Sequence, residues 1–387
     1  MIDFEFYNPT RIIFGRKSYE KIGKEVSAYS NKILLHYGGK SIKKNGIYDQ
    51  VVAELENAGI QFFELGGVMP NPRLSLVEQG IDICRREDID FILAVGGGSV
   101  IDSAKAIASG VHYDGSVWDF YTSSKRPERV LDIGVVLTIP AAGSESSDGS
   151  VITNEAGPDK KSFTSPKLYP KFSILNPQAC TTIPPYQIAV GGADILAHVM
   201  ERYFTCTENT DLSDRLCEGA MLALLQNLPM VKENKEDITA WEEVLWTGNI
   251  AHNSLLGKGR EEDWACHAIE HEVSAIYDIA HGAGLAILFP AWMKYVYKSN
   301  VKRFVQFAIR VFQVNMPYEN QEDIALEGIK RLEEFFQSLG LFTRFSQVGI
   351  GDSDFGIIAE KACGDWELGA LKRLRKNDVL EILKLAK

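Results

Sequence analysis

The chain lacks the features of a disulfide-stabilised or membrane-spanning protein. Its cysteines are scattered and none forms a Cys-x-x-Cys pair, which argues against a disulfide framework and a thiolate zinc site. No apolar run approaches the roughly 20 residues that cross a bilayer. The first residues show no basic stretch followed by an apolar one, so we expect no signal peptide and a cytoplasmic protein. The six cysteines are Cys84, Cys180, Cys206, Cys217, Cys266 and Cys363.

The chain also has fewer basic than acidic residues. The 41 basic residues are outnumbered by 52 acidic ones, which gives a net charge of −11. An acidic chain is poorly suited to bulk binding of nucleic acid or of an anionic membrane surface. With 45% hydrophobic and 24% charged residues, the 387-residue chain has the composition of a globular protein of two to three domains.

The chain changes character near its middle. Short apolar, β-branched runs at residues 32–37, 60–64, 90–95 and 134–138 alternate with helical periods in the first half. This alternation predicts a parallel sheet covered by helices on both faces. After the two prolines at 184 and 185, helical periods dominate. We therefore predict an α/β domain over residues 1–184 and an all-helical domain over residues 185–387, and the motifs described next make the first a dinucleotide-binding domain and the second a metal-binding, catalytic domain.

Glycine-rich turns follow two of the predicted strands. Gly96-Gly97-Gly98-Ser99 lies between a strand and a helix, where bare backbone amides and a helix N-terminus favour a phosphate, and Asp102 lies one turn further on. Neither this turn nor Gly38-Gly39-Lys40-Ser41 completes a standard dinucleotide or Walker A motif. Tight turns without a ligand are the alternative. Two such turns on adjacent strands would suit a dinucleotide at the carboxyl edge of the sheet.

Histidines are concentrated in the second half, where five of the seven lie between residues 198 and 281. Asp194 and His198 are four residues apart on a predicted helix, as are His267 and His271, and His281 follows. Imidazoles with one carboxylate suit Zn²⁺ or Fe²⁺.

A rival interpretation is a metallopeptidase, because His267, Glu270 and His271 also match a His-x-x-Glu-His zinc motif with Glu270 as general base. That interpretation leaves Asp194, His198 and the glycine turns without a role. The remaining histidines, His36, His112 and His252, we interpret as structural or solvent-exposed.

Taken together, these motifs make the chain resemble the iron-containing alcohol dehydrogenase family, in particular its butanol dehydrogenase branch. The resemblance covers nearly the whole chain and is most specific over residues 263–271 and 277–286. It implies metal ligands at Asp194, His198, His267 and His281. It places His271 beside the metal, where we expect it to deliver or relay a proton. It implies cofactor contacts at Asn71, Gly97, Gly98, Ser99, Asp102, Thr138 and Lys160, beside the turn Gly38, Gly39, Lys40 and Ser41.

One departure from the family pattern bears on the cofactor. Relatives that prefer NAD often carry an aspartate after the first strand, and this chain has Gly39 followed by Lys40. A missing carboxylate and a nearby cation favour NADP(H) over NAD(H).

The expected function is a metal-dependent alcohol dehydrogenase or aldehyde reductase acting on short- to medium-chain primary alcohols and aldehydes, and the resemblance suggests a homodimer. Trp264, Tyr277 and Phe120 are candidate substrate-pocket residues. A glycerol-dehydrogenase-like polyol oxidoreductase, a dehydroquinate-synthase-like protein and an inactive scaffold of the same fold remain alternatives.

Overall fold

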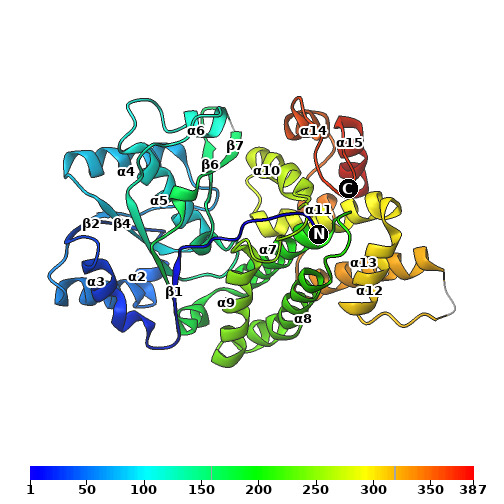
Figure 1. Ribbon diagram of the computed structural model, residues 1–387, viewed down its shortest axis with the longest axis horizontal. Helices are drawn as coiled ribbons and strands as arrows, with labels where there is room; N and C mark the ends of the chain where they lie inside the picture. Colours follow the sequence, from blue (N-terminus) through cyan, green and yellow to red (C-terminus); the bar gives the residue numbers. More distant parts are fainter. Residues whose placement is uncertain (158, 318–319) are drawn as a thin grey trace. The chain divides into compact units, whose positions relative to one another are not determined.

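A computed structural model describes residues 1–157, 159–317 and 320–387, which form two compact units (Figure 1). The α/β unit comprises Tyr7–Ile183 and Lys235–Asn249, and the helical unit comprises Met1–Phe6, Pro184–Asn234 and Ile250–Lys387. Among the helices of the described ranges, none is both long and apolar enough to cross a membrane.

A six-stranded parallel sheet in the order β1-β8-β5-β4-β2-β3 forms the centre of the α/β unit. A separate antiparallel hairpin pairs β6 with β7. The strands are β1 (Arg11–Phe14), β2 (Lys32–Tyr37), β3 (Gln61–Leu65), β4 (Phe91–Gly96), β5 (Asp132–Leu137), β6 (Gly149–Asn154), β7 (Asp159–Thr164) and β8 (Phe172–Leu175).

Helices cover both faces of this sheet. On one face, Ile33, Leu35 and Tyr37 of β2 pack in a core with Val26 of α1 and Leu55 of α3. On the other face, β2 presents His36, whose ring bonds Ser103 of α5. The near-continuous apolar strands therefore reflect burial on both sides. The helices of this unit are α1 (Ile22–Ser27), α2 (Ser41–Lys44), α3 (Ile47–Asn57), α4 (Leu74–Arg86), α5 (Gly98–Gly110), α6 (Asp119–Thr122) and most of α9 (Ile238–His252).

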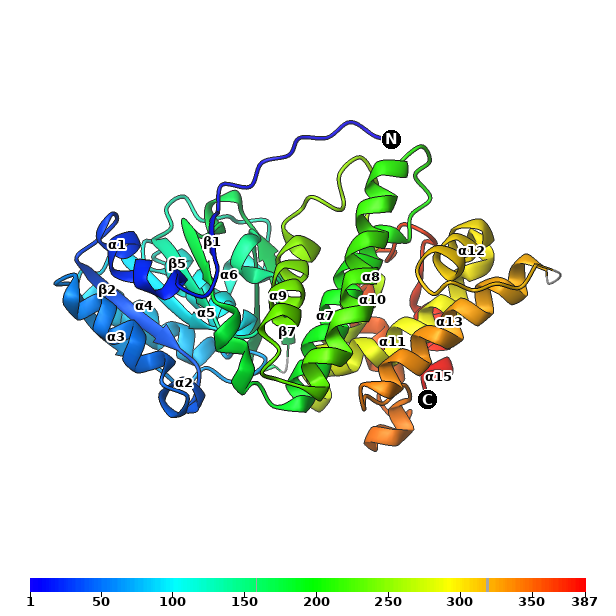
Figure 2. The same ribbon diagram turned by 90° about the horizontal axis from the view of Figure 1, so that it is seen from below.

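The helical unit is built around two buried helices, α7 and α11. Figure 2 shows α7 and α8 running side by side in this unit, and α7 also packs directly on α11. Its helices are α7 (Pro185–Tyr203), α8 (Asp211–Glu233), α10 (Ala265–Tyr277), α11 (His281–Val296), α12 (Val301–Arg310), α13 (Gln321–Ser338), α14 (Phe355–Cys363) and α15 (Lys376–Leu385). The predicted fold class, a parallel α/β part followed by a helical part, is confirmed.

The two units differ from a simple division after residue 184. Met1–Phe6 groups with the helical unit, and Lys235–Asn249 groups with the α/β unit. Contacts of α9 explain the second assignment: Trp246 packs edge-on against Phe14 with ring centres 6.0 Å apart, and Asn249 donates to the Glu145 carboxylate at 3.0 Å. Helical periodicity alone does not reveal which core a helix joins.

Candidate metal and dinucleotide sites

Helix α7 supplies the first two predicted metal ligands. It begins with Pro185 in its first turn, where proline costs no hydrogen bond. Asp194 and His198 lie on one face, both about 5% exposed, and His198 Nε2 is 3.3 Å from Asp194 Oδ1. Glu201, one turn further on, is fully buried.

The other ligands come from α10 and α11, which a short connection joins. Close packing of α11 on α7 depends on Gly282, because a Cβ there would lie 2.0 Å from the carbonyl oxygen of Val190. This approach brings His281, the first residue of α11, beside α7, so that His281 Nε2 lies 3.9 Å from Asp194 Oδ1.

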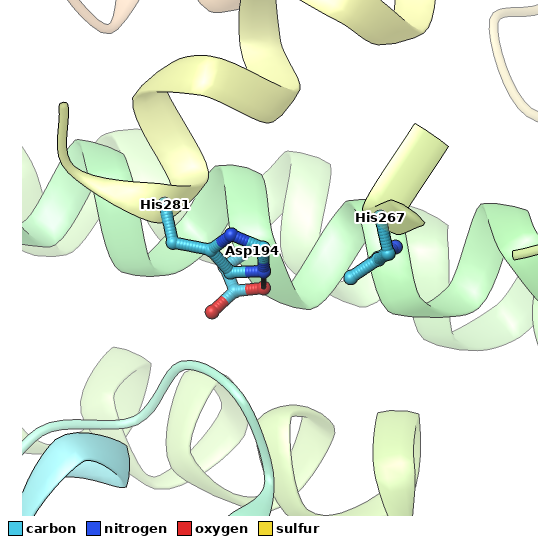
Figure 3. Close-up of side chains that lie close together, drawn as sticks. All are labelled: Asp194, His267 and His281. Carbon is cyan, nitrogen blue, oxygen red and sulfur yellow. Dashed lines mark ion pairs between the residues drawn. The ribbon is translucent and has the colours of Figure 1, made fainter. Parts of the chain in front are cut away.

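Three of the four predicted ligands form a tight group in the structure. Ligand atoms of Asp194, His267 and His281 all lie within 4.8 Å of one another (Figure 3). His198 adjoins this group, since its ring centre is 4.5 Å from that of His267. Segments separated by some 70 residues of sequence thus meet at one buried point.

This donor set fits a divalent transition ion. Two bonds of about 2.1 Å at a tetrahedral angle place their ligand atoms roughly 3.4 Å apart, close to the 3.3 Å between His198 Nε2 and Asp194 Oδ1. Burial and the neighbouring His252 and His267 hold the pKa of His198 well below its usual range, so this imidazole is neutral and has a lone pair to offer. Within the described residues, the buried His198 Nδ1 has no hydrogen-bond partner. Three imidazoles and one carboxylate suit Zn²⁺ or Fe²⁺.

Two buried carboxylates beside the histidines were not predicted as parts of the metal site. Glu201 Oε1 accepts a hydrogen bond from His267 Nδ1 at 2.7 Å, and Glu270 Oε2 accepts one from His281 Nδ1. The helical spacing of Glu201 from His198 and of Glu270 from His267 was the available signal. Glu270 is fully buried and also bonds Ser274, which leaves it badly placed to activate a water molecule as the metallopeptidase interpretation requires.

His271 lies beside the cluster and, like His281, is not fully buried. It is partly exposed, and its ring centre is 5.4 Å from that of His281. Atoms of His271, Glu270 and His281 form a second group with metal-compatible spacing. The structure therefore places the His271 ring next to the ring of His281, a predicted ligand.

His252 and Trp264 complete the surroundings of His198. The His252 ring centre is 4.2 Å from that of His198, and its Nδ1 bonds Arg202 at 2.9 Å. Trp264 has a left-handed backbone with φ of 64° and packs edge-on against His198 and His267. His252, interpreted from the sequence as structural or solvent-exposed, therefore lies beside a predicted ligand, and its place on another helix gave no spacing signal.

The predicted glycine turns meet at one edge of the sheet. Strands β2 and β4 are neighbours, and the chain leaves them in opposite directions, to β3 on one side and β5 on the other. Such a switch point forms a crevice at the carboxyl ends of the strands. Gly38, Gly39, Lys40 and Ser41 follow β2, Gly97 caps α5 after β4, and Thr138 follows β5 with its amide bonded to Gly96 at 3.0 Å.

Other predicted cofactor residues surround this edge. Gly98 and Ser99 form the first turn of α5. Asn71 is buried with a left-handed φ of 54°. Lys160 pairs with Thr153 in the β6–β7 hairpin, and the Thr153 amide bonds Pro72 at 2.8 Å. The hairpin therefore brings Lys160 toward Asn71.

Asp102 and Phe120 have roles inside the protein. The Asp102 carboxylate accepts from Ser144 Oγ at 2.6 Å and from the Val151 amide at 3.1 Å, and thereby ties α5 to β6. Burial raises its pKa despite the nearby Lys105. Phe120 is a core residue packed on Tyr113 and Phe163, which argues against a substrate contact.

Tyr277 has a different environment. It lines a cavity of about 320 Å³ in the helical unit and donates to Asp354 at 2.5 Å. Ile279 and Ala283, two residues on either side of His281, also line this cavity, and none of its lining residues in the described part of the chain is charged. The segment that carries His281 therefore borders this cavity.

Comparison with known proteins agrees with this architecture. Residues 9–177 match the model of the iron-containing alcohol dehydrogenases, and residues 188–387 match the C-terminal model of the same family. A probable NADH-dependent butanol dehydrogenase of Bacillus subtilis is 46% identical over 99% of both chains. The NADPH-dependent aldehyde reductase YqhD of Escherichia coli is 33% identical over 93% of both chains. The crystal structure of an NADH-dependent butanol dehydrogenase A from Thermotoga maritima superposes with a TM-score of 0.95 at 40% identity, covering 99% of this chain and 98% of that one.

Proposed function

The chain belongs to the iron-containing alcohol dehydrogenase family, and we propose that it interconverts short- to medium-chain primary alcohols and aldehydes, such as butanol and butanal, with NADP(H) as the preferred cofactor. The observation that carries the proposal is the meeting of Asp194, His267 and His281, with His198 alongside, in a largely buried donor set suited to Fe²⁺ or Zn²⁺. The relatives' names, butanol dehydrogenase and aldehyde reductase, support the reaction class.

Separate sets of residues would bind the metal ion and the dinucleotide. A bound ion supplies Lewis acidity, which polarises an aldehyde and acidifies an alcohol. Asp194, His198, His267 and His281 would hold it. The turns at Gly38–Ser41 and Gly97–Ser99, with Asn71, Asp102, Thr138 and Lys160 near them, would bind or support the dinucleotide, and aligned backbone amides favour its phosphates.

A proton must accompany the hydride when an aldehyde is reduced. We assign its delivery to His271, which is partly exposed and can recover a proton from solvent. A bound dinucleotide would supply the hydride, and the role of His271 would be to give a proton to the carbonyl oxygen. When an alcohol is oxidised, the His271 imidazole would accept the proton instead.

The preference for NADP(H) rests on the turn after β2. It holds no carboxylate to repel a 2′-phosphate, and the exposed Lys40 adds a positive charge there. The names of the relatives do not support this preference: the Bacillus and Thermotoga proteins, at 46% and 40% identity, are named NADH-dependent, and the Escherichia protein, at 33% identity, is named NADPH-dependent.

The test is consumption of NADPH and NADH with butanal by protein reloaded separately with Fe²⁺ and Zn²⁺. We expect metal-dependent turnover that is faster with NADPH. Gly39→Asp is the matched variant, expected to weaken NADPH use while sparing NADH. Turnover with NADH alone would overturn the cofactor preference and keep the enzyme. Turnover of polyols but not of butanal would overturn the substrate class.

We also propose a homodimer. Strand β1 lies at the edge of the sheet, and the residues before it expose Ile2, Phe4 and Phe6. An open strand edge and exposed alternating apolar side chains favour pairing with another chain. Light scattering coupled to size exclusion tests this proposal, and a monomeric mass would contradict it.

A further inference from the structure

Two of the joints between the ligand-bearing helices α7, α10 and α11 each contain a buried carboxylate. Glu201 extends from α7 to α10, and Glu270 extends from α10 to α11. Both side chains are completely buried. A buried carboxylate is costly unless donors surround it, so such positions call for a specific partner.

Glu201 fixes the start of α10. Its Oε1 accepts from the His267 amide at 3.0 Å and from His267 Nδ1 at 2.7 Å, while its Oε2 accepts from the Trp264 amide at 2.7 Å. An ionised carboxylate has no proton to donate and can only accept hydrogen bonds, and three donors converge on this one. The same side chain therefore caps α10, holds the left-handed backbone at Trp264 and orients the His267 ring.

Glu270 has the corresponding position at the next joint. It accepts from His281 Nδ1 through one oxygen and from Ser274 Oγ through the other. Its close approach requires Gly284, where a Cβ would lie 2.7 Å from Glu270 Oε1. The glycines of Gly282-Ala283-Gly284 thus serve two contacts, one with the backbone of α7 and one with Glu270.

Both bonds have the same consequence for the imidazoles. A proton held on Nδ1 leaves the Nε2 lone pair as the one available to a metal, and it fixes the plane of the ring. His281 Nε2 indeed faces Asp194 Oδ1, at 3.9 Å. His198 has no such support, since no partner for its Nδ1 exists among the described residues.

We propose that Glu201 and Glu270 are positioning residues that select the metal-binding tautomer of His267 and His281 and slow the loss of the ion. This inference rests on the metal site of the proposed function. It also gives Glu270 a role different from the general base of a His-x-x-Glu-His peptidase.

The experiment compares Zn²⁺-loaded protein with its Glu201→Gln and Glu270→Gln variants, in which the side-chain volume is kept and the charge is lost. Release of Zn²⁺ to a chromophoric chelator is expected to be about 10–100-fold faster in each variant. Glu272→Gln is the control, because Glu272 lies on the same helix, is 7% exposed and pairs with Lys361 at 3.3 Å. Release rates of both variants equal to that of the control would overturn the proposal.

A second measurement uses the unsubstituted protein, so it tests the proposal even if the variants do not fold. In Zn²⁺-loaded protein labelled with ¹⁵N-histidine, the Nδ1 atoms of His267 and His281 are expected to be protonated. Coordination through Nδ1 of either ring would overturn the assignment. Protein that binds no stoichiometric Zn²⁺ at all would instead contradict the metal site itself.

Discussion

At the scale of single residues, a substitution at His271 tests proton transfer separately from metal binding. Replacing it with alanine should lower aldehyde turnover by about 10²–10⁴-fold, the usual contribution of a general acid. Metal content should stay unchanged, because His267 and His281 have their own partners in Glu201 and Glu270. Steady-state kinetics and metal analysis on one preparation measure both effects, with the exposed His112→Ala as control. Undiminished turnover would remove His271 from the mechanism.

His36 is the residue whose protonation bears most clearly on stability. It is fully buried in β2, its Nδ1 donates to the Leu65 carbonyl at 2.8 Å, and Ser103 bonds Nε2 at 2.9 Å. Burial lowers its pKa to about 4, against 6.5 for a free histidine. Between these values the unfolded chain binds the extra proton, so stability falls as the pH drops from 6.5 to 4, by about 3 kcal/mol from this group.

His36→Gln keeps both hydrogen bonds possible and does not titrate. Urea unfolding between pH 4 and 7 should therefore show a weaker loss of stability at acid pH in this variant than in the unsubstituted protein. Equal slopes for the two proteins over this range would show that the ring is not held neutral.

At the scale of elements, α5 is tied to the loop before β6 by a buried lysine. Lys105 Nζ donates to the carbonyls of Ser144, Ser147 and Gly149 at 2.7, 2.8 and 2.9 Å, and its side chain is fully buried. Burial lowers its pKa to about 8, although Asp102 opposes this shift. The start of the same helix carries the phosphate-binding turn proposed above.

Lys105→Met keeps the aliphatic stem and removes all three donors. We expect a loss of about 3 kcal/mol in stability, because three buried carbonyls lose their partner. The KM for the dinucleotide should rise more than kcat falls, since the loop and α5 lose their link. Urea unfolding and cofactor titration check this, with the exposed Lys24→Met as control. An unchanged KM would show that Lys105 contributes to the stability of the fold and not to dinucleotide binding.

The same elements show what the sequence can and cannot predict. Strands β2 and β4 were predictable because continuous apolar runs end in glycine turns. Strands β1 and β8, of four residues each, were not predicted, because such short strands leave no clear period. The β6–β7 hairpin was not predicted because its strands, GSVITN and DKKSFT, are rich in polar residues. Helical spacing predicted Asp194 with His198, whereas the meeting of α7 with α10 and α11 depends on tertiary packing. The hydrogen bonds of Glu201 and the position of His252 beside His198 therefore became visible only in three dimensions.

At the scale of the whole molecule, the two proposed ligands belong to different compact units. The metal ligands all lie in the helical unit, and the glycine turns all lie in the α/β unit. A ligand that binds only folded protein stabilises the unit that holds it, by about 2.7 kcal/mol at a concentration of 100 times Kd. Such a gain raises the melting temperature of a unit of this size by roughly 5–10 °C.

Calorimetry with each ligand alone tests this separation. Zn²⁺ should raise the melting transition of the helical unit, and NADP⁺ that of the α/β unit, so that the order of the two transitions depends on the ligand. Asp194→Asn should abolish the first shift and spare the second, because it removes the ligand toward which His198 and His281 converge. A single transition moved equally by both ligands would instead show that the two units unfold as one cooperative structure, and would contradict the separation of the two binding sites into independent units.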